Sequence, residues 1–334
     1  MGHEIDMSKY DVRTDLAIDL TDNSDTHYES GDVSVSKIYL DEDKGKIINK
    51  KKGMYTTIEF KDVTDYDNAS QIKGVFFKEL SSMLLYMGIN DNDSCLVIGL
   101  GNKKSAPDSI GPMTLDKIIV TNHLFQYGEV EEGFRRVFGI SPSVMGETGI
   151  ETSDYVLGIC KVIKPDFVII VDALASSSIE RVNKTIQMTD AGINPGSGIG
   201  NVRKEISYDS LRIPVLAIGV PTVVDAASIV SDTIRYMYKH FAYTRANFNN
   251  PAYRLMVGAN YLNKDVYVDS NDKKNLFGLV GNLSDDDVKK FIYEILNPIG
   301  YNLMVTPKEE DFVAIKIAEV LGDGINRALH KKLE

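Results

Sequence analysis

Two aspartates stand where catalytic acids are often found. Asp172 directly follows the apolar run Phe167 to Val171, and Asp108 follows Pro107 just before a predicted helix. A short apolar run between polar segments is typical of a buried parallel strand, and open α/β sheets bind ligands at the carboxyl ends of such strands. Two carboxylates that face each other there do not both ionise easily, so one keeps a proton while the other deprotonates water. Such a pair is suited to hydrolysing amide bonds.

Each aspartate also has a purely structural interpretation. Asp108 precedes a predicted helix, where a carboxylate commonly caps the helix by accepting bonds from backbone N–H groups. Asp172 could be a buried acid that is hydrogen-bonded at the end of its strand. Both acids follow neighbouring strands of one predicted sheet, and this shared edge favours a functional pair. We therefore predict Asp108 and Asp172 as the catalytic residues.

Two glycine-containing loops could support such a site. The segment Val97-Ile-Gly-Leu-Gly-Asn102 is a strand followed by a turn, where glycine permits a positive φ and close approach of a ligand. It lacks the third glycine of a dinucleotide-binding fingerprint. The loop from Gly192 to Lys204 has four glycines, and it could bind an anion, accommodate an extended peptide or serve as a connector. The supporting loop residues that we predict are Gly101, Asn102, Gly196 and Gly198.

Other catalytic chemistries have less support in the sequence. The five histidines do not occur in a recognisable triad or a His-x-x-x-His setting, and there is no Gly-x-Ser-x-Gly motif. Cys95 and Cys160 both lie inside apolar runs, so we interpret them as small core residues rather than as a disulfide or metal site. This cysteine usage favours a reducing compartment.

Alternating strands and helices must position the two aspartates. Apolar runs predict buried strands at residues 94–99, 167–171 and 214–221. Strands that alternate with helices are typical of an α/β fold, here a mostly parallel sheet with helices on both faces. The predicted helices cover residues 69–87, 110–125, 152–162, 223–240, 284–296 and 307–333.

The chain length leaves two interpretations of the domain organisation. A length of 334 residues allows about two domains, and one large α/β domain with additions fits equally well; we predict the single domain. The acidic stretch at residues 19–52 is interpreted as an extension before the main domain, with one candidate strand at 33–40. Residues 241–272 are rich in asparagine and aromatic residues, and we interpret them as an irregular insertion that is a lid or a subunit contact.

Composition disfavours several classes of partner. The formal net charge of -11 opposes non-specific binding to nucleic acids or anionic lipids, so we expect no direct nucleic-acid binding. No apolar run approaches the roughly 18 residues of a membrane span. The first 30 residues also lack the apolar segment of a secretion signal. We therefore expect a cytoplasmic protein that does not bind membranes.

Several long motifs resemble those of one known family. They are Tyr10-Asp-Val-Arg-Thr-Asp-Leu-Ala17, Met145-Gly-Glu-Thr-Gly-Ile-Glu-Thr-Ser-Asp154, Asn194-Pro-Gly-Ser-Gly-Ile-Gly-Asn201 and Gly219-Val-Pro-Thr-Val-Val-Asp225. Together with Cys95 to Asn102 and Val171 to Ala175, they resemble the germination protease of spore-forming bacteria. The resemblance covers nearly the whole chain.

The resemblance implies a fold, an activity and a set of partners. The fold would be similar to that of hydrogenase maturation proteases, which bind a metal at the matching acids. The activity would be that of an aspartic-type endopeptidase, a hydrolase that uses Asp108 and Asp172 without a metal or cofactor. Its substrates would be the small acid-soluble proteins that coat spore DNA. The family also implies a homotetramer in the cytoplasm of the forespore, which becomes the spore core.

The same resemblance implies a self-processing zymogen. The family's substrates carry a Thr-Glu-Phe-Ala-like sequence that is cut after the acid, and Thr14-Asp15-Leu16-Ala17 matches this pattern. We therefore predict cleavage between Asp15 and Leu16, with residues 1–15 as propeptide and 16–334 as the protease domain. Two alternatives remain open: a metal-dependent, maturation-type protease, and a non-catalytic binding protein for the same partners.

Overall fold

The computed structural model describes residues 14–21, 24–128, 130–195, 204–250, 267–296 and 303–333. The chain divides into two compact units, which we describe separately. Among the described residues, the larger unit contains 14–176, 180–223 and 306–333. The smaller unit contains 177–179 and the described parts of 224–305. Every predicted site residue that the structure describes belongs to the larger unit.

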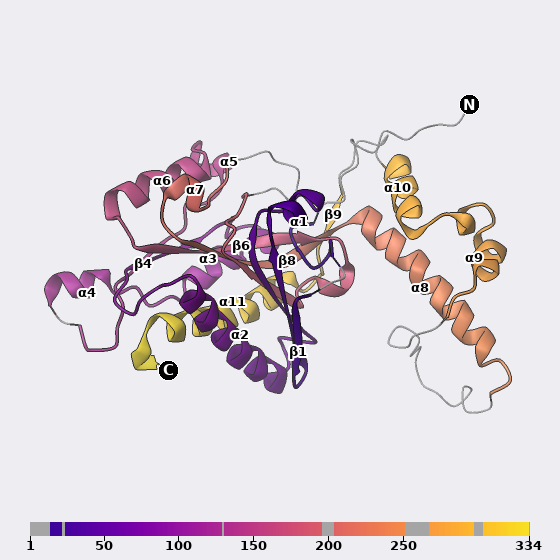
Figure 1. Cartoon of the computed structure of the whole chain (residues 1–334), viewed down its shortest axis with the longest axis horizontal. Helices are drawn as coiled ribbons and strands as arrows, with labels where there is room; N and C mark the ends of the chain where they lie inside the picture. Colours follow the sequence, from indigo (N-terminus) through magenta and orange to yellow (C-terminus); the bar gives the residue numbers. More distant parts are fainter. Residues whose placement is uncertain are drawn as a thin grey trace. The chain divides into compact units, whose positions relative to one another are not determined.

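The larger unit is built on a mixed β-sheet (Figure 1). Its strands lie in the order β1-β2-β3-β7-β8-β6-β4-β5. A ninth strand, β9, pairs with Val224 and Asp225 at the end of β8, and these residues belong with β9 to the smaller unit. The strands are β1 (Thr26–Ser30), β2 (Val33–Leu40), β3 (Gly53–Phe60), β4 (Cys95–Gly99), β5 (Val137–Ile140), β6 (Phe167–Ser176), β7 (Thr185–Thr189), β8 (Val215–Asp225) and β9 (Met304–Val305).

Strand directions require a correction to the predicted mostly parallel sheet. Strand β4 pairs in parallel with both β5 and β6. The pairs β1–β2, β2–β3, β3–β7, β7–β8 and β8–β9 are antiparallel. For β1 and β2 the physical reason is local, because only Gly31 and Asp32 join them, and a two-residue connection allows antiparallel but not parallel neighbours. The acidic stretch at 19–52 thus supplies β1, β2 and the short helix α1 (Glu42–Ile47).

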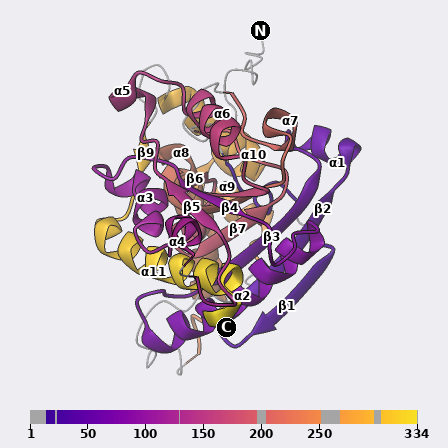
Figure 2. The ribbon, with the colours of Figure 1, turned by 90° about the vertical axis from the view of Figure 1, so that its left-hand side faces the viewer.

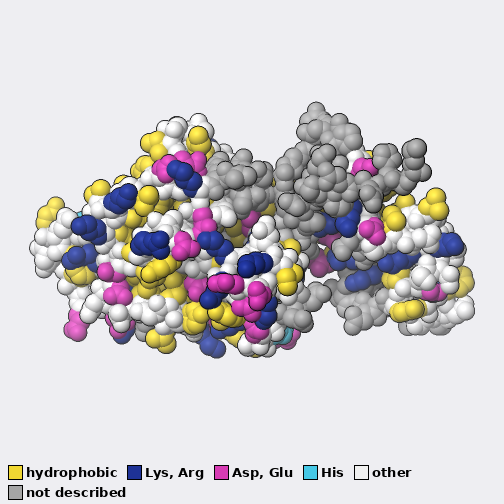
Figure 3. All heavy atoms as spheres, turned by 45° about the horizontal axis from the view of Figure 1, so that its top comes forward, with side chains coloured by type: hydrophobic (Ala, Val, Ile, Leu, Met, Phe, Trp, Pro, Cys, Tyr) yellow, Lys and Arg dark blue, Asp and Glu magenta, His cyan; other side chains and the backbone are white. Residues whose placement is uncertain are grey.

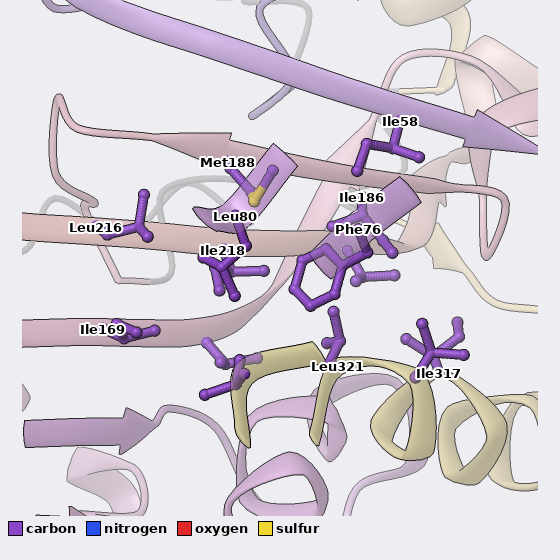
Figure 4. Close-up of a cluster of buried hydrophobic side chains, with 14 of the residues drawn as sticks. Ile58, Phe76, Leu80, Ile169, Ile186, Met188, Leu216, Ile218, Ile317 and Leu321 are labelled. Carbon is purple, nitrogen blue, oxygen red and sulfur yellow. The ribbon is translucent and has the colours of Figure 1, made fainter. Parts of the chain in front are cut away.

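Helices cover both faces of the sheet, as predicted for the α/β class (Figure 2). In β4 and β6, alternate side chains enter two different cores because successive side chains of a strand point to opposite faces. Val97 and Ile169 belong to the core that also contains side chains of helices α2 (Tyr66–Tyr86) and α11 (Glu310–Leu329), and Figure 4 draws part of this core, including Ile169. Leu96 and Ile170 pack instead with α6 (Thr152–Ile163) and α7 (Tyr208–Leu211).

One predicted helix is wrong as a single element. Residues 110–125 form α3 (Ile110–Leu115) and α4 (Asn122–Tyr127), with a break between them. Thr121 explains the break, because its side chain donates to the carbonyl of Arg135 and accepts from the N–H of Val137 at 2.9 Å. These bonds tie the chain to β5. The remaining predicted helices correspond to elements of the structure, with shifted ends.

The smaller unit consists mainly of helices. They are α8 (Ala226–Ala246), α9 (Ser270–Phe277) and α10 (Asp285–Leu296). A small core of Ala227, Val288 and Ile292 joins α8 to α10. Residues 251–266 of the predicted insertion lie outside the described residues. In the part of the chain that the structure describes, no helix has the length and apolarity needed to span a bilayer.

Charged side chains are distributed over the visible surface in both signs. Lysine and arginine side chains lie among aspartate and glutamate side chains on the face shown in Figure 3. Many charged side chains of the described residues form ion pairs, such as Lys104 with Glu147 and Lys204 with Asp154. The face shown in Figure 3 therefore carries charges of both signs.

Candidate active site

Asp172 lies inside strand β6. The strand continues to Ser176, so the prediction that it ends at Asp172 is wrong. The residue before it, Val171, is the register partner of Gly99 in β4. Asp172 is 6% exposed, and its Oδ1 accepts a hydrogen bond from the N–H of Ala173 at 2.9 Å. The carboxylate is therefore held within the sheet and mostly shielded from water.

Asp108 is the last residue of the 3-10 helix η2 (Ala106–Asp108). Its N–H donates to the carbonyl of Ser105 at 2.9 Å, and its carbonyl accepts from the N–H of Asn102 at 2.8 Å. The N-cap of α3 is Ser109, so Asp108 does not occupy the capping position suggested by the sequence. The predicted loop residues thus hold the backbone of Asp108.

Gly101 must be glycine for this loop to close. Its φ is +110°, a conformation that side chains disfavour. A Cβ at Gly101 would lie 2.1 Å from the carbonyl oxygen of Asp108 and 2.9 Å from its Oδ1. In this structure it is the protein's own Asp108 that closely approaches Gly101, and the role of Gly101 in an active-site loop stays a prediction.

The two aspartates come from elements that pack against each other. Helix η2, which ends in Asp108, contacts β6, and so does α3. The N–H of Leu100 donates to the carbonyl of Val171 at 2.8 Å. A Cβ at Gly111 would lie 2.1 Å from the carbonyl oxygen of Leu100 and 2.5 Å from that of Val171. The start of α3 therefore rests directly on the backbone that leads into Asp172.

A buried polar network lies behind Asp108 and was not found from the sequence. Thr222 of β8 is fully buried, and its hydroxyl donates to the carbonyl of Pro107 at 2.6 Å. Thr306 donates to the carbonyl of Thr222 at 3.0 Å and lies 3.2 Å from Glu310 Oε2. The amide of Asn183 donates to the same Oε2 at 2.5 Å. Burial raises the pKa of Glu310 above that of an ordinary glutamate.

The predicted cleavage junction is partly exposed at Asp15 and buried at Leu16 and Ala17 in this structure. Leu16 and Ala17 are both 0% exposed. Asp15 exchanges two bonds with Ala175 of β6: its N–H donates to the carbonyl of Ala175, and its Oδ2 accepts from the N–H of Ala175, both at 2.9 Å. Gln187 of β7 accepts from the N–H of Ala17 at 2.7 Å and donates to the carbonyl of Asp15 at 3.2 Å. Residues 14–17 are therefore held beside β6 and β7.

Charged groups surround this junction. Lys50 Nζ donates to the carbonyl of Thr14 at 3.0 Å, and burial lowers the pKa of this lysine against the opposing influence of Asp15 and Asp19. Asp19 accepts from the hydroxyl of Thr14 at 2.5 Å and pairs with Arg181 at 2.6 Å. The junction is thus stabilised by both hydrogen bonds and ion pairs.

The remaining predicted residues can be placed briefly. Gly196 and Gly198 lie outside the described residues. Cys95 and Cys160 are buried free thiols, which confirms their assignment to the core. Burial raises the pKa of Cys160 to about 11, so it is not a reactive thiolate at neutral pH. Within the described ranges, His, Cys, Asp and Glu side chains form no group of three or more that could hold a metal ion.

Comparison with known proteins decides the family. A family model described as germination protease matches residues 3–334. The chain belongs to the germination protease family. It is 45% identical over 354 residues to the germination protease of Bacillus licheniformis, with 99% of this chain and 96% of that protein covered. The resemblance noted in the sequence is therefore confirmed.

Other relatives agree over the same length. The chain is 43% identical over 361 residues to the germination protease of Priestia megaterium, with 100% of this chain and 98% of that protein covered. It is 44% identical over 358 residues to that of Bacillus cereus, with the same coverage. Membership of this germination protease family identifies the protein as a peptidase, a hydrolase. A NiFe hydrogenase maturation protease from Thermococcus kodakarensis matches 43% of this chain and 80% of its own, with a TM-score of 0.27 and 14% identity.

Proposed function

We propose that this protein is an aspartic-type endopeptidase in which Asp108 and Asp172 are the catalytic residues. The main support is that η2, which ends in Asp108, packs against β6, which contains Asp172. Membership of a peptidase family supplies the reaction class, and two acids from contacting elements offer the groups that the reaction needs.

The pair would hydrolyse a peptide bond by dividing two roles. One carboxylate takes a proton from water as the water oxygen attacks the substrate's carbonyl carbon, and the protonated partner gives its proton to the carbonyl oxygen. The tetrahedral intermediate then collapses and the C–N bond breaks: the first acid gives its proton to the leaving nitrogen, and the second takes back a proton from a hydroxyl of the intermediate. The products are a carboxylic acid and an amine, and the two acids return to their starting protonation.

The substrates that we propose are the small acid-soluble proteins that coat spore DNA, degraded during germination. The printed name of the relatives supports a role in germination, and the matched segment Thr14-Asp15-Leu16-Ala17 supports cleavage after an acidic residue. We also propose that the enzyme acts as a homotetramer in the forespore and spore core, without a cofactor. Light scattering of the purified protein tests the oligomeric state, since a mass other than four chains would contradict it.

We further propose that the protein is a zymogen that cuts itself between Asp15 and Leu16. Because Leu16 and Ala17 are fully buried here, the junction must leave its site before any carboxylate can reach its peptide bond. Burial of this kind is consistent with a precursor that stays uncut until conditions change.

The test compares Asp108→Asn, Asp172→Asn and wild type on a peptide containing Thr-Glu-Phe-Ala. We expect both variants to lose cleavage of the peptide and formation of a chain beginning at Leu16. Asp116→Asn is the matched control, because Asp116 is an aspartate close in sequence that pairs on the surface with Lys103. Full activity of either site variant would refute the acid pair.

A chelation arm separates the proposed mechanism from the metal-dependent alternative. Activity that persists after treatment with a chelator and dialysis supports the acid pair alone. Activity that is lost and then restored by a divalent metal would favour the maturation-type mechanism. Substrate that is bound but never cut by the wild type would favour the non-catalytic binding protein.

A further inference from the structure

Thr222 makes a contact that bears directly on the backbone of Asp108. Its hydroxyl donates at 2.6 Å to the carbonyl of Pro107, and that carbonyl belongs to the peptide unit that contains the nitrogen of Asp108. In the same peptide unit, the N–H of Asp108 donates to the carbonyl of Ser105. In the next peptide unit, the carbonyl of Asp108 accepts from the N–H of Asn102. These three bonds fix the peptide planes on both sides of the Asp108 Cα.

Thr222 is itself held in place on two sides. Its side chain is fully buried in strand β8, and its carbonyl accepts from the hydroxyl of Thr306 at 3.0 Å. The neighbouring carbonyl, that of Pro221, accepts from the N–H of Asn183 at 2.8 Å. Both Thr306 and Asn183 also reach Glu310 Oε2. The network therefore connects the start of α11 to the backbone of Asp108 through Thr222.

Thr306 has a single hydroxyl proton for two acceptors. It can therefore donate fully to the Thr222 carbonyl or to Glu310 Oε2, but not to both. Glu310 is 2% exposed, and burial raises the pKa of its carboxyl above that of an ordinary glutamate. Thr306 thus joins Thr222 to Glu310 whichever acceptor takes its proton.

We propose that Thr222 is a positioning residue that fixes Asp108 for catalysis, supported from behind by Thr306, Glu310 and Asn183. The inference rests on the proposed role of Asp108 as a catalytic acid. Catalytic groups act within a narrow tolerance, and a shift of about 1 Å can cost on the order of a hundredfold in rate. Loss of the bond from Thr222 leaves this partly buried carbonyl without its protein partner and allows the η2 turn to relax.

The test is a steady-state comparison of Thr222→Val with wild type on the Thr-Glu-Phe-Ala peptide. Valine has the shape of threonine and suits a strand, so it removes the hydroxyl with little change in packing. We expect kcat to fall about tenfold to a hundredfold while KM stays within about twofold, because the substrate's contacts are unchanged. Thr222→Ser keeps the hydroxyl and should restore kcat to near the wild-type value.

Thr57→Val is the matched control. Thr57 is another fully buried strand threonine, in β3, and its hydroxyl has no hydrogen-bond partner. The same substitution there should leave both kcat and KM unchanged. If Thr222→Val fails to fold, Thr222→Ala replaces it, because Ser and Ala differ only by the hydroxyl and should then differ in kcat by the same factor.

The outcomes separate this inference from the proposed function. A normal kcat in Thr222→Val, a loss confined to KM, or equal impairment of Thr222→Ser and Thr222→Ala would overturn the positioning role. Full activity of Asp108→Asn would overturn the proposed catalytic pair instead. Loss of activity in Asp108→Asn together with a kcat defect in Thr222→Val that serine rescues supports both.

Discussion

The side chain of Gln187 bonds to the backbone of Asp15 and of Ala17, the residues that flank Leu16 at the predicted cleavage junction. We therefore predict that Gln187→Leu will make opening of this junction easier. The side chain accepts from Ala17 N–H at 2.7 Å and donates to Asp15 C=O at 3.2 Å. Leucine has a similar volume but can make neither bond. Opening of residues 14–17 should therefore become easier without loss of the fold.

The size of the effect follows from the two lost bonds. Each net hydrogen bond contributes about 1 kcal/mol, and the buried N–H of Ala17 is left without its acceptor. A loss of about 2 kcal/mol in the free energy of local opening corresponds to roughly thirtyfold more frequent opening. The other bonds of the junction, to Ala175 and from Lys50, remain in the variant.

Hydrogen exchange measures the opening without relying on self-cleavage. Peptides covering residues 14–20 are compared between Gln187→Leu and its parent, both carrying Asp172→Asn so that the proposed chemistry is removed. Ile186→Val is the control, because Ile186 is the preceding residue of β7 and is buried in the main core. It should lower global stability by about 1 kcal/mol without accelerating exchange at the junction selectively.

Self-processing gives the second measurement. With Asp172 restored, Gln187→Leu should produce the chain that begins at Leu16 faster than wild type, as followed by intact mass. Exchange at the junction that stays within about threefold of the parent would show that Gln187 does not hold this segment. Faster exchange with unchanged processing would refute the idea that opening limits the cleavage.

Three further predictions concern stability and pH. Gly324→Ala should lower the free energy of unfolding by about 1–3 kcal/mol, because its Cβ would lie 2.3 Å from Phe76, whereas Gly74→Ala in the open part of α2 should raise it; denaturant titration measures both. The pKa of Glu310 is raised, so the contribution of Glu310 to stability is full at low pH and is lost as pH rises through the folded-state pKa. Glu310→Gln should therefore reduce the dependence of the free energy of unfolding on pH, measured between about pH 4 and pH 8. The pKa of Lys50 is lowered, so the contribution of Lys50 to stability is lost as pH falls through the folded-state pKa. Amide hydrogen exchange of residues 14–20, corrected for intrinsic rates, should therefore become faster on acidification, and the increase should be smaller in Lys50→Met.

The sequence was sufficient to find β4 and β6, which pair in parallel, but not β5, the other parallel neighbour of β4. The runs before Gly99 and Val171 are apolar at every position because both of their faces enter a core, and this pattern requires no knowledge of distant residues. Strand β7 escaped notice for the opposite reason. Its residues Thr185–Thr189 are all buried, yet three of the five are polar. A search for runs of apolar residues therefore does not find this strand.

Contacts between distant residues explain the remaining differences. The break between α3 and α4 depends on Thr121 reaching Arg135, which local helical spacing does not reveal. In the same way, Asp108 and Asp172 stand out because each follows a recognisable pattern, whereas Thr222 lies in an apolar strand and gains its significance from Pro107, 115 residues away. A sequence pattern can suggest the acids and the nearby loop residue Asn102, but a residue such as Thr222, which contacts this loop from another strand, emerges only from the fold.

The sheet order also has a consequence for how the chain matures on the ribosome. Strands β1, β2 and β3 can pair with one another early in synthesis. The other edge of β3 pairs with β7, so the pairing of Tyr55 with Thr189 cannot form until β7 has been synthesised. Until then β3 presents unpaired backbone groups, which is the condition that promotes pairing between nascent chains. Non-local pairing of this kind also slows folding. We therefore expect that truncation before β7 yields an aggregating fragment, and that the full sheet forms only after the middle of the chain has emerged.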